Sequence, residues 1–185
     1  MKNLPNILTI LRIILIPIIL LLIVLDTNNT NFLALAGFII ASLSDYLDGY
    51  LARKYNFTSN FGTMLDPIAD KLLIILVGSI LSYRGDINGI HLIPFLLIVS
   101  REIFISGIRE YLAQLDKKIS LPVSKLGKYK TAAQMMALFC LLLNPLVANN
   151  LFFTAELGIL ILWIASILSL LSGCLLYTSP SPRDS

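Results

Sequence analysis

Four aspartates between residues 45 and 70 have the spacing of a metal site. They form the pattern Asp45-x2-Asp48-Gly49-x2-Ala52-Arg53-x8-Gly62-x3-Asp66-x3-Asp70. On helices, positions 45, 48, 49 and 52 share one face, and positions 62, 66 and 70 share another. Two such faces that meet form a cage of carboxylate oxygens, which suits hard divalent cations such as Mg²⁺ or Mn²⁺. The glycines leave room for the phosphates of a ligand.

The four aspartates lie among apolar residues that predict membrane helices, so their charge needs neutralisation. An ionised carboxylate near the bilayer centre costs roughly 2.5–3.5 kcal/mol on insertion scales. The alternative to a metal site is a set of buried ion pairs, but only Arg53, Lys54 and Lys71 lie nearby in the sequence. Bound cations are therefore the preferred interpretation.

The complete motif resembles the signature of the CDP-alcohol phosphotransferases, integral membrane enzymes that move a phosphatidyl or related group from a CDP-linked donor to an alcohol. The resemblance implies two Mg²⁺ or Mn²⁺ ions, and it assigns Asp70 as the general base that takes the proton of the acceptor hydroxyl. The implied metal ligands are Asp45, Asp48, Asp66 and Asp70. The implied donor nucleotide-binding residues are Gly49, Ala52, Arg53 and Gly62. For Arg53, two roles remain open: contact with the phosphates of the donor, or a structural ion pair with an aspartate.

The elements that position these residues are predicted to be membrane helices of one domain, residues 1–173. Hydrophobic residues make up 57% of the chain and charged residues 14%, and the apolar residues come in long runs. The fold class expected is all-α, an integral membrane protein with six transmembrane helices and an N-terminal interfacial helical segment. The six segments lie at about residues 7–25, 32–52, 63–82, 88–108, 131–148 and 151–173.

The start of the chain could also be a signal peptide. The first apolar run is too long for one, contains Arg12 and lacks a small-residue cleavage site, so we expect it to be retained. Its polar residues Asn6, Thr9 and Arg12 recur every three positions before the unbroken apolar run. This spacing predicts an interfacial helix.

The basic residues predict the orientation of the chain. Lys2, the Arg53–Lys54 pair and the lysines of residues 117–128 fall on one side of the six-span scheme, whereas residues 26–31 and 144–150 lack Lys and Arg. The positive-inside rule places the N-terminus and the aspartates on the cytoplasmic side of the cell membrane, with Arg84 as an exception. A net charge of +3 without basic-aromatic clusters gives no reason to expect nucleic acid. Cys140 and Cys174 lack the spacing of a disulfide or metal pair.

Two further stretches resemble family members that use CDP-diacylglycerol and sn-glycerol 3-phosphate. One contains two Arg-Glu pairs eight residues apart, and the other is the basic stretch 125–135. Forked Arg donors and Lys point charges suit a phosphate. The predicted acceptor phosphate-binding residues are Arg101, Arg109, Lys125, Lys128 and Lys130. Local salt bridges and positive-inside anchoring are the alternatives for these stretches.

The implied reaction is phosphatidyl transfer to glycerol 3-phosphate, which gives phosphatidylglycerophosphate and CMP, in a homodimer embedded in the bilayer. Alternatives within the family are enzymes that make phosphatidylinositol phosphate, phosphatidylserine or cardiolipin. An alternative from another class is a membrane cation transporter whose aspartates bind the transported ion. His91 and Trp163 are expected to have roles at the membrane interface or in packing.

Residues 174–185 are expected to be a non-native tail. The sequence from Cys174 to Ser185 resembles the translation of a sequencing adapter, so we do not expect these residues to belong to the native fold. A short disordered polar tail is the alternative.

Overall fold

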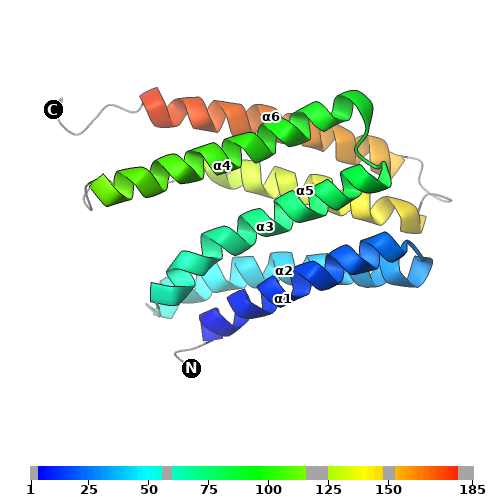
Figure 1. Cartoon of the computed structure of the whole chain (residues 1–185), viewed down its shortest axis with the longest axis horizontal. Helices are drawn as coiled ribbons and strands as arrows, with labels where there is room; N and C mark the ends of the chain where they lie inside the picture. The colour runs from blue at the N-terminus through cyan, green and yellow to red at the C-terminus, as the bar shows by residue number, and fades with distance from the viewer. Residues whose placement is uncertain (1–3, 56–59, 116–124, 148–152, 179–185) are drawn as a thin grey trace.

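The computed structural model is all-helical in the residues that it describes, which are 4–55, 60–115, 125–147 and 153–178. Consecutive helices run alternately up and down, so both chain ends lie at the same end of the bundle (Figure 1). The helices are α1 (Leu4–Leu25), α2 (Asn28–Tyr55), α3 (Asn60–Arg84), α4 (Leu92–Leu115), α5 (Lys125–Val147) and α6 (Phe153–Thr178), with a 3-10 turn, η1 (Gly89–His91), before α4.

The all-α prediction is confirmed for the described residues, whereas six membrane spans remain a prediction. Three helical stretches of the described chain are long and apolar enough to cross a membrane, namely Gly89–Tyr111, Tyr129–Val147 and Thr154–Gly173. Thr9–Leu25 forms a shorter apolar helix. Residues 174–178 of the predicted non-native tail continue α6, and residues 179–185 lie outside the described residues.

The N-terminal segment is helical, and its place at the membrane interface stays a prediction. The described chain forms one continuous helix from Leu4 to Leu25. Thr9 and Arg12, two of the three polar residues predicted to face the interface, are buried in the bundle. Arg12 forms an ion pair there with Asp70 of α3, whose side chain is partly exposed.

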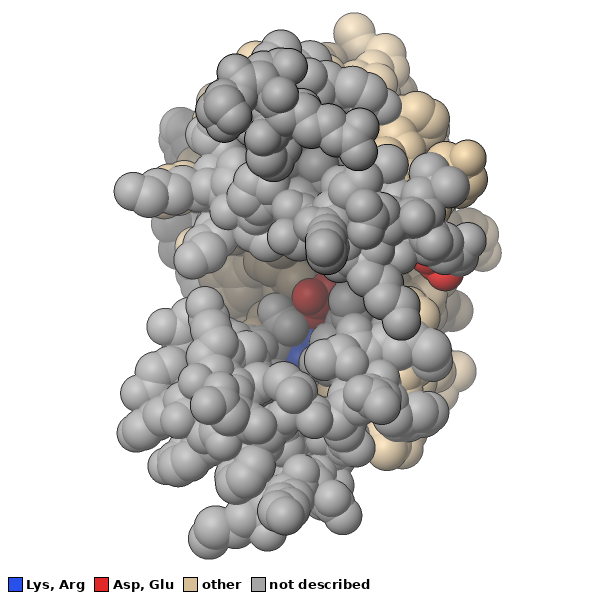
Figure 2. Space-filling view, turned by 90° about the vertical axis from the view of Figure 1, so that its left-hand side faces the viewer, with Lys and Arg blue, Asp and Glu red and all other residues tan. Residues whose placement is uncertain are grey.

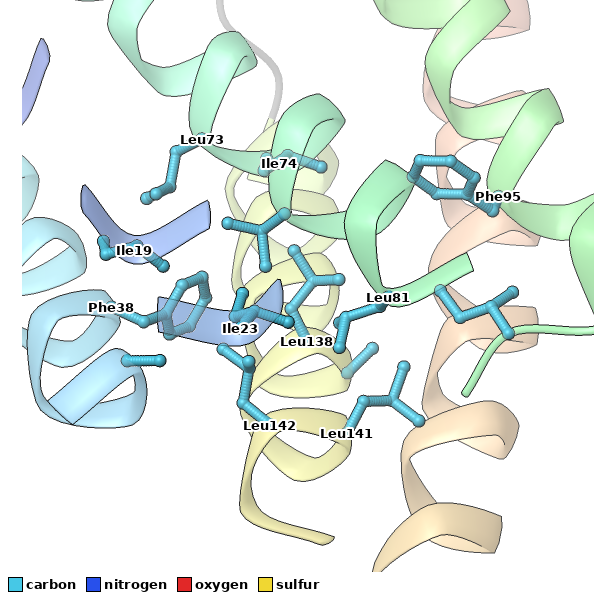
Figure 3. Packing of buried hydrophobic residues seen from close by; sticks show 14 of the residues in the cluster. Ile19, Ile23, Phe38, Leu73, Ile74, Leu81, Phe95, Leu138, Leu141 and Leu142 are labelled. Atoms are coloured by element: carbon cyan, nitrogen blue, oxygen red, sulfur yellow. The ribbon is translucent and has the colours of Figure 1, made fainter. Parts of the chain in front are cut away.

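The bundle consists of two groups of helices joined by α5. Helix α1 packs against α2 and α3, while α6 packs against α4 and most extensively against α5. Helix α5 also contacts α2 and α3, so the core lies where it meets the first group. Figure 3 shows apolar side chains of this core converging from several helices. They include Ile19, Ile23, Phe38, Leu73, Leu81, Leu138, Leu141 and Leu142.

The outer surface of the bundle carries many large apolar side chains. Ile14, Leu21, Leu43, Phe104 and Ile167 are among those that are more than half exposed. Contiguous apolar surface of this kind is unfavourable in water and matches contact with lipid. The burial pattern therefore agrees with a membrane protein.

Arg84, the exception to the positive-inside pattern, is neutralised at the end of the bundle remote from the chain termini. Its Nε donates to Asp86 Oδ2 at 2.5 Å, and its Nη1 lies 3.5 Å from Asp26 Oδ1. The same Nη1 donates to Asn31 Oδ1 at 3.2 Å. One arginine thus ties the α1–α2 turn to the α3–η1 turn.

Candidate functional site

The predicted site residues lie toward one end of the bundle, the end that also holds both chain termini. The motif aspartates lie in the last half of α2 and the first half of α3, and the acceptor cations lie in the later part of α4 and the start of α5. Because these helices alternate in direction, the segments meet at the same end (Figure 1). Figure 2 looks onto this end, where acidic and basic atoms of described residues are visible near the middle of the view.

Much of the predicted cage lies outside the described side chains. This holds for Asp45, Asp48, Asp66, Ala52, Arg53, Lys125 and Lys128, and the glycine positions 49 and 62 fall in the same stretches. The metal cage and the nucleotide contacts therefore stay predictions. The described site residues are Asp70, Arg101, Arg109 and Lys130.

Asp70 is paired with a cation that the spacing of the motif did not reveal. Arg12 Nη1 donates to Asp70 Oδ1 at 2.6 Å across 58 positions of sequence. The Arg12 side chain is fully buried, whereas the Asp70 side chain is 33% exposed. Helix α1 packs against both aspartate-bearing helices, and this contact explains why it supplies the cation. The pair fixes one carboxylate oxygen from the buried side and leaves Asp70 partly open.

The acceptor cations Arg101 and Lys130 meet at a buried carboxylate. Glu102 Oε1 accepts a hydrogen bond from Lys130 Nζ, and Arg101 Nη1 lies 3.3 Å from the same oxygen. The local Arg101–Glu102 pair agrees with the salt bridge that the sequence suggested. Arg109 is exposed on the same helix as Arg101. The structure therefore brings Arg101 and Lys130, two described cations of the predicted acceptor pocket, to one carboxylate.

Several polar residues near this cluster were missed by the sequence analysis. Arg101 Nη2 donates to Ser172 Oγ at 3.0 Å, so α6 also contributes to the cluster. Gln134, one helical turn after Lys130, is buried, and neither atom of its amide group has a hydrogen-bond partner within the described structure. Their position could have indicated them, because polar side chains inside apolar stretches of sequence need hydrogen-bond partners.

An apolar groove of about 280 Å³ lies between α2 and α5, beginning one turn before the motif. Its lining includes Phe38, Leu43, Met135 and Phe139. Several of these side chains are flexible or aromatic, which suits contact with hydrocarbon. Leu43, the last lining residue on α2, precedes position 45 by two residues.

His91 and Trp163 lie at the end of the bundle away from the aspartates. Trp163 Nε1 donates to His91 Nδ1 at 3.2 Å, which joins the turn before α4 to α6. This contact agrees with a packing role for Trp163, whereas the interface role expected for His91 stays a prediction. It places the single histidine of the chain away from the predicted chemistry.

Comparison with known proteins identifies what this chain is similar to. The model of the family described as CDP-alcohol phosphatidyltransferase matches residues 2–171. The chain is 45% identical over 173 residues to the CDP-diacylglycerol--glycerol-3-phosphate 3-phosphatidyltransferase of Rickettsia typhi, and the alignment covers 94% of each chain. Proteins of the same name from Haemophilus influenzae and Shigella flexneri are 41% and 37% identical, with 92% and 98% of this chain covered and 89% and 96% of theirs.

Removal of the Arg12 charge should destabilise the fold through Asp70. Arg12→Gln leaves a partly buried carboxylate without its guanidinium, so we expect unfolding in detergent to become easier by about 3 kcal/mol. In a double-mutant cycle with Asp70→Asn, the coupling energy should reach about 1–3 kcal/mol. Lys71→Gln is the matched control, because adjacent helical residues point in different directions and its coupling to Asp70→Asn should be near zero. Equal coupling for both cations would contradict the assignment.

Proposed function

This chain belongs to the CDP-alcohol phosphatidyltransferase family, and we propose that it transfers the phosphatidyl group of CDP-diacylglycerol to sn-glycerol 3-phosphate, giving phosphatidylglycerophosphate and CMP. The observation that carries the proposal is the meeting, at one end of the bundle, of the motif helices with a cluster of phosphate-binding cations. Membership of a transferase family sets aside the cation transporter.

The donor set of the motif fits divalent cations. Asp45, Asp48 and Asp66 would hold two Mg²⁺ or Mn²⁺ ions together with Asp70, because carboxylate oxygens are their preferred ligands. Such ions, when bound, supply positive charge that offsets the charge of the pyrophosphate and the departing CMP. The chain's own contribution is rigidity, since Arg12 holds the Asp70 carboxylate from the buried side.

Asp70 is also the residue proposed to take the proton from the acceptor hydroxyl. Its side chain is partly exposed while one oxygen is held by Arg12, so the carboxylate is both oriented and accessible. A base must lie within hydrogen-bond reach of the proton that it removes. The orientation and the partial exposure of Asp70 suit this role.

The donor lipid needs an apolar surface beside a polar site. The groove between α2 and α5 offers such a surface, and we propose that it receives an acyl chain of CDP-diacylglycerol. Gly49, Ala52 and Gly62 would permit close approach of the cytidine diphosphate, and Arg53 would lie near its phosphates. The phosphate of the acceptor is assigned to Arg101, Arg109 and Lys130, with Lys125 and Lys128 as further donors.

We further propose that all six helices span the cell membrane, with the active site on the cytoplasmic side, and that the enzyme is a homodimer. Exposed apolar side chains around the bundle support the first point. The dimer rests on the family resemblance and is checked by the molar mass of the purified protein in detergent.

Release of CMP from CDP-diacylglycerol should require a divalent cation and a phosphate-bearing acceptor. With glycerol 3-phosphate, inositol phosphate, serine, phosphatidylglycerol and free glycerol offered in parallel, glycerol 3-phosphate should give the fastest CMP release. Asp48→Asn should insert normally and lose turnover, because a cage ligand is missing. Full activity of the wild type in chelator, or faster release with inositol phosphate, would reject the proposal.

The two ends of α4 should face opposite sides of the membrane. In a cysteine-free background, Asn88→Cys should react with an impermeant maleimide from outside the cell, and Glu110→Cys only after the membrane is opened. Both residues are exposed, so the difference reports sidedness rather than burial. Labelling of both cysteines from the same side would overturn the six-span orientation.

Arg109→Ala should weaken use of glycerol 3-phosphate and leave the donor lipid unaffected. A lost charge-assisted contact with phosphate is worth about 1.5–3 kcal/mol, which corresponds to about one to two decades in kcat/KM. Free glycerol lacks the phosphate, so its slow turnover should change little. The measurement is kcat/KM for both acceptors in the wild type and the variant. An equal decrease for both acceptors would show that Arg109 does not bind the phosphate.

A further inference from the structure

Glu102 lies among the cations that the proposed function assigns to the acceptor phosphate. The residue is 8% exposed and Lys130 is 7% exposed, so their pair is shielded from water. Glu102 accepts from Lys130 Nζ, and the same oxygen lies 3.3 Å from Arg101 Nη1. A single carboxylate oxygen thus holds cations from both α4 and α5.

The cluster has more positive than negative groups. Arg101 and Lys130 both pair with Glu102, which is the acid buried with them in the described structure. Cations gathered in a low-dielectric region repel one another, so they stay together only with a counter-charge. Glu102 provides that counter-charge in the absence of ligand.

Part of the cluster is held independently of Glu102. Arg101 Nη2 donates to Ser172 Oγ at 3.0 Å, and that hydroxyl donates in turn to the Ser169 carbonyl at 2.9 Å. Arg101 Nε is buried and has no hydrogen-bond partner in the described structure. The guanidinium is therefore positioned by α6 and retains a donor that an incoming anion can use.

We propose that Glu102 is an internal counter-anion that occupies the cations in the empty site and is displaced from them by the phosphate of the acceptor. Identification of that phosphate with the acceptor rests on the proposed function. A phosphate dianion offers more charge and more acceptor oxygens than a carboxylate, so it competes for Lys130 and Arg101. An uncharged alcohol cannot compete and leaves Glu102 in place. Glu102 is thus a specificity-determining residue.

The test compares binding of inorganic phosphate to the wild type and to Glu102→Gln. The full chain is purified in detergent and its Tm is measured against phosphate concentration, since a ligand of the folded state raises Tm. Without the competing carboxylate, the phosphate concentration that gives half of the maximal Tm shift should be about tenfold lower, equivalent to about 1.4 kcal/mol. Without phosphate, the variant should be less stable than the wild type.

Glu110→Gln is the matched control, because it makes the same change eight residues later in the same helix at an exposed position. Its response to phosphate should equal that of the wild type. If Glu102→Gln does not fold, Glu102→Asp retracts the carboxylate by one methylene and should shift the midpoint in the same direction by a smaller factor. A Tm that is lowered equally at all phosphate concentrations would overturn the proposal, because it is the result of a purely structural role.

Kinetics separate this proposal from the function on which it rests. In Glu102→Gln, KM for glycerol 3-phosphate should fall several-fold while the slow rate with free glycerol stays unchanged. If the wild type releases CMP and the variant keeps both its KM and its phosphate midpoint, the role of Glu102 is wrong and the function stands. If the wild type releases no CMP but the phosphate midpoint of Glu102→Gln is lower as expected, the proposed function is wrong. Glu102 then occupies a binding site for another phosphate compound.

Discussion

The need to neutralise charge inside an apolar bundle constrains this structure more than any other interaction. Arg12 and Asp70 form one neutralising pair, and Glu102 and Lys130 form another. Each pair joins two different helices, α1 with α3 and α4 with α5, so it fixes how these helices lie together as well as satisfying charge. A buried pair is weak evidence for net stability, yet loss of one partner is costly. These contacts therefore specify the arrangement that the apolar core stabilises.

The apolar core alone would not determine how the two helix groups meet. Leucine and isoleucine pack in many registers, and exchange of one apolar neighbour for another changes the free energy little. Close approach adds some specificity, since a Cβ at Gly78 would lie 2.2 Å from the Phe95 ring. Helix α5 contributes both kinds of contact: Leu138 and Leu141 enter the core, and Lys130 enters the charge cluster. The same helix thereby connects the packing of the bundle to its candidate site.

The positions of the helices could largely be predicted from the sequence, because long apolar runs broken by polar turns leave few alternatives. The signature residues also gave Asp70 and the family before any coordinates. The partner of Asp70 could not be derived in this way, since 58 positions separate it from Arg12 and local spacing carries no information on such contacts. The burial of Arg12 in the bundle could not be derived for the same reason: periodicity shows which residues share a face but not what that face contacts.

Glu102 illustrates a second limit of sequence reasoning. The adjacent Arg101 predicts a local salt bridge, and the structure contains one, but the stronger contact is with Lys130 on another helix. If the pair with Arg101 were its only contact, Glu102 would affect α4 alone. A shared oxygen between two helices instead makes it the residue that sets how much positive charge the site presents. The chemistry available to this end of the bundle thus depends on a balance of charges contributed by α1, α3, α4 and α5, and no single motif contains that balance.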